Sequence, residues 1–82
     1  MAGESRRIVV YSTPLCAPCE RLKRFLADNH IPFVNRDLMM DEAAAELVER
    51  HNIRTAPVLG IDDRLYAGND LVPDRLRALL KL

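Results

Sequence analysis

Short apolar runs alternate with stretches of helical periodicity along this chain. Continuous runs of β-branched and aromatic residues favour buried strands, whereas apolar residues spaced three and four apart favour amphipathic helices. Proline, glycine, asparagine and aspartate residues separate the segments and mark turns. The pattern predicts a strand, a helix, a strand, a helix, two strands and a helix, which cover residues 8–11, 20–29, 32–36, 42–51, 57–61, 64–67 and 70 onward.

This order predicts an α/β fold in which a four-stranded mixed sheet is flanked by three helices. The opening strand, helix and strand imply a parallel pair joined by a right-handed crossover. Asp62 and Asp63 mark a hairpin turn between the last two strands, which are therefore antiparallel.

The same periodicity predicts which side chains are buried. Arg21, Lys23 and Arg24 are expected to form a solvated face of the first helix, opposite its apolar residues, with recruitment of an acidic partner as the alternative. The residues expected in the core are Tyr11, Leu22, Phe25, Leu26, Phe33, Ala44, Leu47, Val48, Leu76, Leu79 and Leu80, with Met39 and Met40 packing in the core or against a loop.

The chain has 82 residues, of which 49% are hydrophobic and 29% are charged. This length supports one domain, residues 1–82, with one modest core, and residues 1–6 are expected to form a flexible tail. Twelve basic and twelve acidic residues cancel, so no net charge favours nucleic acid or an anionic membrane as a partner. No apolar run suits a signal peptide or a membrane span, and the cytoplasm is the expected compartment.

Both cysteines, Cys16 and Cys19, stand in one Cys-x-x-Cys segment between the first strand and the first helix. A cysteine at a helix N-terminus meets unpaired N–H groups and the positive end of the helix dipole, which favour the thiolate. The thiolate is the nucleophile of thiol–disulfide exchange, and a second thiol can resolve the mixed disulfide. Structural disulfides are rare in the cytosol, so the resting state is expected to be the dithiol. The segment therefore indicates a redox site.

The cysteine pair has two other interpretations, a structural disulfide and a zinc site. A structural disulfide across so short a loop would remove little chain entropy. A zinc site needs four ligands, of which the pair supplies two, and His30 and His51 are too far apart in sequence for a usual histidine pair. Both histidines stand at predicted helix ends, where capping or plain exposure is expected. No metal site is predicted.

Three motifs resemble the glutaredoxin branch of the thioredoxin-like superfamily, and the similarity extends over nearly the whole chain. The motifs are Tyr11-Ser12-x-Pro14-x-Cys16-x-x-Cys19, Thr55-Ala56-Pro57-Val58 and Gly68-Asn69-Asp70. The resemblance implies the thioredoxin-like glutaredoxin fold, β-α-β-α-β-β-α. It also implies a thiol–disulfide oxidoreductase, a dithiol redox carrier in which Cys16 attacks protein disulfides and a buried Cys19 resolves the mixed disulfide.

The resemblance further implies a cis peptide bond before Pro57 and a position for Pro57 beside Cys16. The residues that it marks for contact with substrate or glutathione are Thr13, Thr55, Ala56, Pro57, Gly68, Asn69 and Asp70. Asp70 has an equally good interpretation as a cap of the last helix. No bound cofactor is expected, although glutathione is a candidate co-substrate. The implied partners of a monomer are disulfide-containing proteins, with thioredoxin reductase or glutathione as the electron donor.

The active-site turn departs from the common glutaredoxin pattern. It has no Lys or Arg between Ile8 and Cys19, and Pro18 directly precedes the second cysteine, as in the Cys-Gly-Pro-Cys of thioredoxins. These features favour the NrdH-type redoxins, glutaredoxin-like proteins that take electrons from thioredoxin reductase, although their Gly-Phe-Arg-Pro signature is missing. Two other functions stay open: an iron–sulfur cluster carrier, for which Cys-Gly-Phe-Ser is the stronger motif, and a binding module for one dedicated redox partner.

Overall fold

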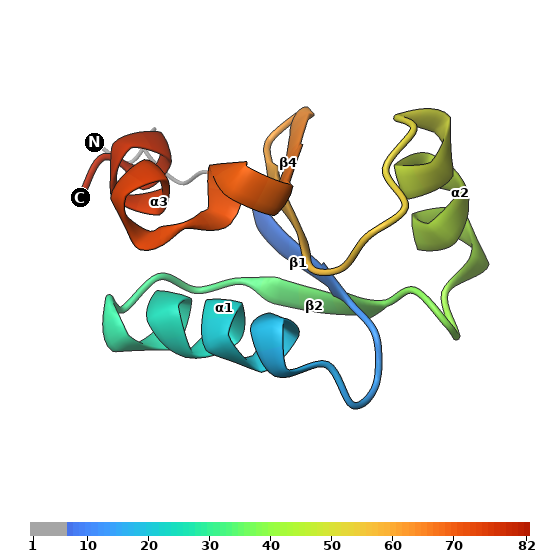
Figure 1. Ribbon diagram of the computed structural model, residues 1–82, viewed down its shortest axis with the longest axis horizontal. Coiled ribbons are helices and arrows are strands. Elements are labelled where there is room, and N and C mark those ends of the chain that lie inside the picture. Colours follow the sequence, from blue (N-terminus) through green and yellow to red (C-terminus); the bar gives the residue numbers. More distant parts are fainter. Residues whose placement is uncertain (1–6) are drawn as a thin grey trace.

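The computed structural model describes residues 7–82, so the predicted tail at residues 1–6 lies outside the described part of the chain. The elements are, in order, β1 Ile8–Ser12, α1 Ala17–Asp28, β2 Val34–Asp37, α2 Glu42–Arg50, β3 Val58–Ile61, β4 Arg64–Ala67, the short 3-10 helix η2 Gly68–Leu71, and α3 Pro73–Leu80 (Figure 1). The predicted order of strands and α-helices is confirmed. Within residues 7–82, no helix is both long enough and apolar enough to cross a membrane.

The four strands form one sheet in the order β2-β1-β3-β4. β1 pairs in parallel with β2 and antiparallel with β3, and β4 returns antiparallel along β3. Figure 1 shows α1 and α3 together on one side and α2 on the other. This is the four-stranded mixed sheet with three helices that the sequence predicts.

The core has one cluster on each face of the sheet. Val10 of β1 and Leu59 of β3 are fully buried on the face covered by α1 and α3, with Leu26 of α1 packed against them. On the opposite face, Tyr11 and Val58 pack against α2. β1 is therefore covered on both faces, which explains why its sequence is apolar without alternation.

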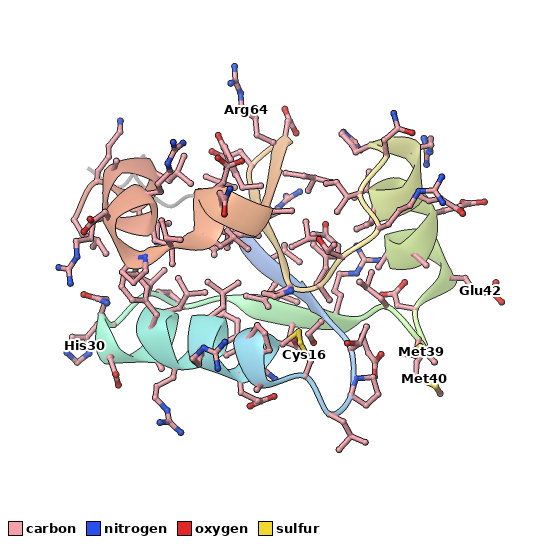
Figure 2. All side chains as sticks on the ribbon, in the orientation of Figure 1. Cys16, His30, Met39, Met40, Glu42 and Arg64 are labelled. Atoms are coloured by element: carbon pink, nitrogen blue, oxygen red, sulfur yellow. A yellow bond between two sulfur atoms is a disulfide. The ribbon has the colours of Figure 1, made fainter. Side chains whose placement is uncertain are left out.

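Met39 and Met40 are largely exposed, at 70% and 80%, and the prediction that they pack in the core or against a loop is wrong. They lie in the turn after β2, where the Asp37 carboxylate accepts the N–H of Met39 at 2.8 Å and the Asp37 carbonyl accepts the N–H of Met40 at 3.1 Å. These bonds close the turn with both side chains directed into solvent (Figure 2). An apolar residue type is no guarantee of burial.

The last helix starts at Pro73, within the range of starts that the sequence predicts, and Asp70 lies in a short helix before it. The chain turns at Gly68, whose φ of +63° suits glycine, and forms η2 before α3 begins at Pro73. The N-cap of α3 is Val72, which makes no side-chain capping bond. Asp70 does not cap this helix, because its carboxylate lies 3.5 Å from the Arg75 guanidinium instead.

The two histidines lie at helix ends, as predicted. Nδ1 of His51 is 2.9 Å from the Leu47 carbonyl at the end of α2. His30 is exposed in the turn after α1. The His51 side chain therefore lies against the last turn of α2, and the His30 side chain is in solvent.

Asp41 joins the start of α2 to β2. Its carboxylate accepts the Ala44 N–H at 3.0 Å as the helix N-cap, and it accepts two hydrogen bonds from Arg36, at 2.8 and 3.0 Å. The bonds from Arg36 and the helix N–H lower the pKa of Asp41 below its ordinary value of 3.8. Arg36 also lies over the Tyr11 ring, 5.9 Å from its centroid.

Replacing Asp41 with Asn should lower the melting temperature at neutral pH, and the deficit should shrink in acid. Because folding lowers the pKa of Asp41, its carboxylate contributes stability above about 3.8, and this contribution is lost as the pH falls through the folded-state pKa. Thermal unfolding followed by circular dichroism between about pH 7 and pH 2.5 measures the effect. The melting temperature of Arg36→Gln should also approach that of wild type as the pH falls. A deficit that stays constant down to the lowest pH would contradict the assignment.

Candidate active site

Cys16 is positioned by the junction of β1 and α1. Leu15, with φ +54° and a fully exposed side chain, turns the chain just before it. Cys16 is the N-cap residue of α1, and its Sγ accepts a hydrogen bond from the N–H of Cys19 at 3.1 Å. α1 therefore begins at Ala17 rather than at residue 20, because the sulfur caps it and Pro18 suits the first helical turn. In the reduced protein, the same N–H favours the thiolate of Cys16.

Cys16 and Cys19 form a disulfide in this structure, with their Cα atoms 5.2 Å apart (Figure 2). This is the oxidised state of the pair, and the dithiol expected at rest is its other state. Cys16 is partly exposed, whereas Cys19 is fully buried. An external thiol or disulfide can therefore reach the sulfur of Cys16 more readily than that of Cys19.

The loop before β3 lies beside this pair. Tyr11 near the end of β1 is in register with Val58 at the start of β3, which places the loop before β3 close to the start of α1. The Ala56–Pro57 peptide bond is cis, as the resemblance implies. Pro57 is buried, Ala56 is half-buried and Thr55 is exposed.

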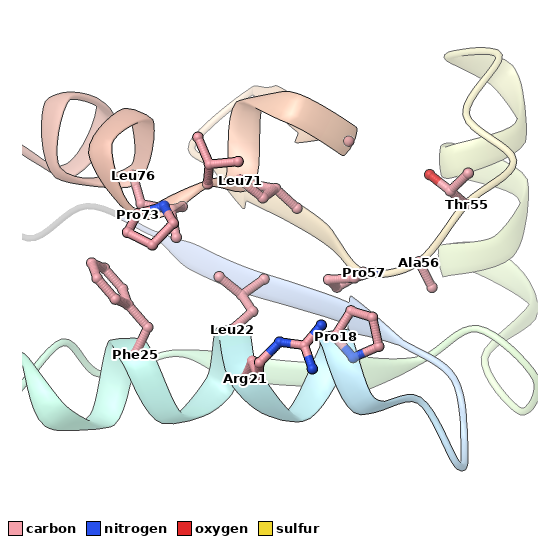
Figure 3. Close-up of a pocket in the computed structure, with 12 residues that line it drawn as sticks. Pro18, Arg21, Leu22, Phe25, Thr55, Ala56, Pro57, Leu71, Pro73 and Leu76 are labelled. Atoms are coloured by element: carbon pink, nitrogen blue, oxygen red, sulfur yellow. The ribbon is translucent and has the colours of Figure 1, made fainter.

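A groove of about 460 Å³, here called the main groove, runs from the start of α1 to α3 (Figure 3). It is lined by Pro18, Arg21, Leu22, Phe25, Thr55, Ala56, Pro57, Gly68, Leu71, Val72, Pro73 and Leu76. The walls are mostly apolar, and Arg21 is the one charged residue among these described lining residues. The groove brings the Cys-x-x-Cys segment, through Pro18, together with the predicted contacts Thr55, Ala56, Pro57 and Gly68.

A second groove of about 480 Å³, here called the α2 groove, lies on the other side of the same loop. Thr55 and Ala56 line both grooves, and the predicted contact Thr13 lines the α2 groove. Its other lining residues are Leu38, Ala45, Val48, Glu49, Ile53 and Arg54. The loop before Pro57 is therefore a ridge between two hollows.

Two predicted contacts stand apart from the main groove. Asn69 is exposed and does not line it. Asp70 faces Arg75 and lines a separate hollow with Asp74 and Leu79. Among residues 7–82, no group of three or more histidine, cysteine, aspartate or glutamate side chains could hold a metal ion.

Arg21 is the groove residue that the sequence analysis missed, since it was assigned to a solvated face. Pro18, Arg21, Leu22 and Phe25 follow helical spacing of three and four residues, so they share one face of α1. This spacing is the feature of the sequence that places Arg21 on the same helix face as the other groove residues of α1. The opposite wall, at Leu71 to Pro73, comes from a distant part of the chain and carries no such signal.

The fold and the disulfide define a thioredoxin-like protein with a redox-active cysteine pair. The glutaredoxin family model matches residues 8–66, well over half of the chain, and the chain belongs to the glutaredoxin family.

Individual relatives agree with this assignment. A glutaredoxin-like 8.6 kDa protein in the rubredoxin operon of Clostridium pasteurianum is 31% identical over 67 residues, which cover 74% of this chain and 83% of that protein. The structure of NrdH-redoxin from Escherichia coli is 26% identical with a TM-score of 0.78, and the match covers 89% of this chain and 93% of that one. The global transcriptional regulator Spx 1 of Bacillus cereus is 33% identical over 42 residues, 51% of this chain. The match spans only about a third of Spx 1, 32% of its length.

Proposed function

We propose that this protein is a dithiol redox carrier that reduces protein disulfides and is recharged by thioredoxin reductase. The observation that carries the proposal is the unequal exposure of the two cysteine residues at the start of α1. Cys16 is partly exposed and accepts a helix N–H, whereas Cys19 is fully buried behind it. An exposed attacking thiol next to a shielded resolving thiol supports two-step thiol–disulfide exchange.

The cycle begins with the reduced protein. The Cys16 thiolate attacks one sulfur of the target disulfide, a bond forms between them, and the target's second sulfur leaves as a thiolate that takes up a proton. Cys19 then loses its proton and attacks the sulfur of Cys16, which releases the target's first thiolate. The target's first thiolate also takes up a proton, so the target gains two electrons from the carrier and two protons, one given up by Cys19 and one by the solvent, and the Cys16–Cys19 disulfide of the structure is left. A dithiol reductase reverses these bonds to restore the carrier.

The loop before β3 would hold the target during this exchange. Pro57 has no N–H to engage, and Thr55, which is exposed, and Ala56, which is half-buried, lie on the ridge between the two grooves. An extended segment of the target can pair with the backbone of this loop like an added strand. The main groove would then receive a side chain of that segment.

The main groove supports a protein as the electron donor rather than glutathione. Its far wall is apolar at Leu71, Val72 and Pro73, and the Asp70 carboxylate is paired with Arg75 away from it. That far wall suits an apolar protein side chain better than the charged end of glutathione, for which Arg21 on the α1 wall is the one charged partner among the described lining residues. NrdH-redoxin, whose thioredoxin-like activity profile has been described, has a similar fold and 26% sequence identity.

NADPH-coupled reduction of a protein disulfide tests the proposal. One arm supplies thioredoxin reductase, and the other supplies glutathione with glutathione reductase. Turnover in the first arm is the expected result, with Cys16→Ser as the inactive control. Turnover in the glutathione arm alone would overturn the proposed donor. Silence in both arms would overturn the carrier function itself, and visible absorbance of the purified protein would then favour an iron–sulfur carrier.

A further inference from the structure

Arg21 stands out in the main groove because its charge has no counterpart there. It is exposed, it is the one charged residue among the described lining residues, and no side-chain hydrogen bond or salt bridge joins it to another part of residues 7–82. The acid beside it in sequence, Glu20, is held by Lys23 at 2.8 Å. The guanidinium is therefore available to a ligand.

The orientation of Arg21 places this charge near the disulfide. Figure 3 shows its side chain running along α1 toward Pro18, so the guanidinium lies at the end of the groove that Pro18 of the Cys-x-x-Cys segment lines. Arg21 follows Cys16 by five residues, a rise of about 7.5 Å along the helix. An extended peptide advances about 3.3 Å per residue. A carboxylate two or three residues from the attacked cysteine of a target would therefore reach it.

The rest of the main groove favours an apolar side chain in the target. Leu22, Phe25, Leu71 and Leu76 form apolar walls next to Arg21. Burying an apolar side chain against them is favourable, and a carboxylate beside it would accept charge-assisted hydrogen bonds from the exposed guanidinium. The groove thus combines one apolar site with one site for an anion.

We propose that Arg21 is a specificity-determining residue that selects protein disulfides flanked by an apolar residue and by an aspartate or glutamate two or three residues from the attacked cysteine. The inference rests on the proposed reduction of protein disulfides and names the class of target. It requires no particular electron donor.

The test uses two matched peptides, each with the same internal disulfide and a leucine beside the attacked cysteine. One peptide carries glutamate two residues from that cysteine, and the other carries lysine there. Pre-reduced protein is mixed with each peptide in a single turnover, and acid-quenched samples are analysed by mass spectrometry. Wild type should reduce the glutamate peptide about 3- to 10-fold faster, a range typical of partly exposed ion pairs with the sign of one partner reversed.

Arg21→Glu should reverse this preference, and added salt should compress the wild-type ratio. Arg24→Glu is the matched control, because Arg24 is exposed on the same helix but does not line the main groove, and it should keep the wild-type ratio within about twofold. An unchanged ratio of the two peptide rates in Arg21→Glu would overturn the inference. An equal change of that ratio in Arg24→Glu would also overturn it, because it would show that the overall positive charge of α1, and not Arg21 in the groove, selects the peptide. If wild type reduced neither peptide, the carrier function itself would fail.

Discussion

Replacing Cys16 with serine should lower kcat/KM for disulfide reduction by at least about 1,000-fold, because the residue supplies the nucleophile. The chain has two cysteines, and Cys19 is fully buried, so no other exposed thiol can take over the attack. A serine hydroxyl stays protonated near neutral pH and cannot form a disulfide with the target. The N–H of Cys19, which now bonds to the sulfur, would still be present but would have no thiolate to stabilise.

The measurement is the NADPH-coupled assay with thioredoxin reductase, together with single-turnover reduction of a protein disulfide. Serine retains the capping ability of the residue, so α1 should still begin at Ala17. Thermal unfolding, compared with wild type in its reduced state, checks that the variant is folded. A folded variant with more than about a tenth of wild-type turnover would show that Cys16 is not the attacking thiol.

The elements of the fold could be predicted because their signals are local. The apolar run of β1 and the Asp41 cap of α2 each reveal an element from a few neighbouring residues. The early start of α1 was missed because a cysteine is an uncommon cap, and here the Cys16 sulfur accepts the helix N–H. The exposure of Met39 was missed because it depends on the turn that Asp37 closes.

The site was only partly predictable for a different reason. The Cys-x-x-Cys segment and the residues before Pro57 carry recognisable motifs. The main groove, however, forms only where α1, the loop before Pro57 and the segment from Gly68 to Leu76 meet. Arg21 belongs to the groove because the segment from Leu71 to Leu76 stands opposite it, whereas the Asp70 carboxylate lies against Arg75, outside the groove. A contact between distant segments decides the place of Arg21, and no local pattern reveals it, whereas Asp70 and Arg75 are five residues apart and meet where η2 leads into α3.

Replacing Cys19 with serine should trap the protein in covalent mixed disulfides with its targets. Cys16 keeps its position and its backbone N–H donor, because that N–H belongs to the main chain of residue 19. The first attack therefore proceeds, whereas the second has no thiol to carry it out. A species joining one carrier to one target should accumulate within the time of a single wild-type turnover. Mass spectrometry and non-reducing gels should detect it, and dithiothreitol should release it.

A serine hydroxyl in place of the fully buried sulfur of Cys19 could disturb packing, so Cys19→Ala serves as a second variant with no polar group. Both variants should trap targets to the same extent, and the double variant with Cys16→Ser should trap none. If Cys16→Ser accumulated the adduct and Cys19→Ser did not, the attacking and resolving roles would be exchanged. Full turnover of Cys19→Ser when glutathione is the only reductant would mean that a small thiol resolves the adduct in place of Cys19. That result would separate a monothiol glutaredoxin reaction from the dithiol cycle proposed here, because only the dithiol cycle requires the buried sulfur.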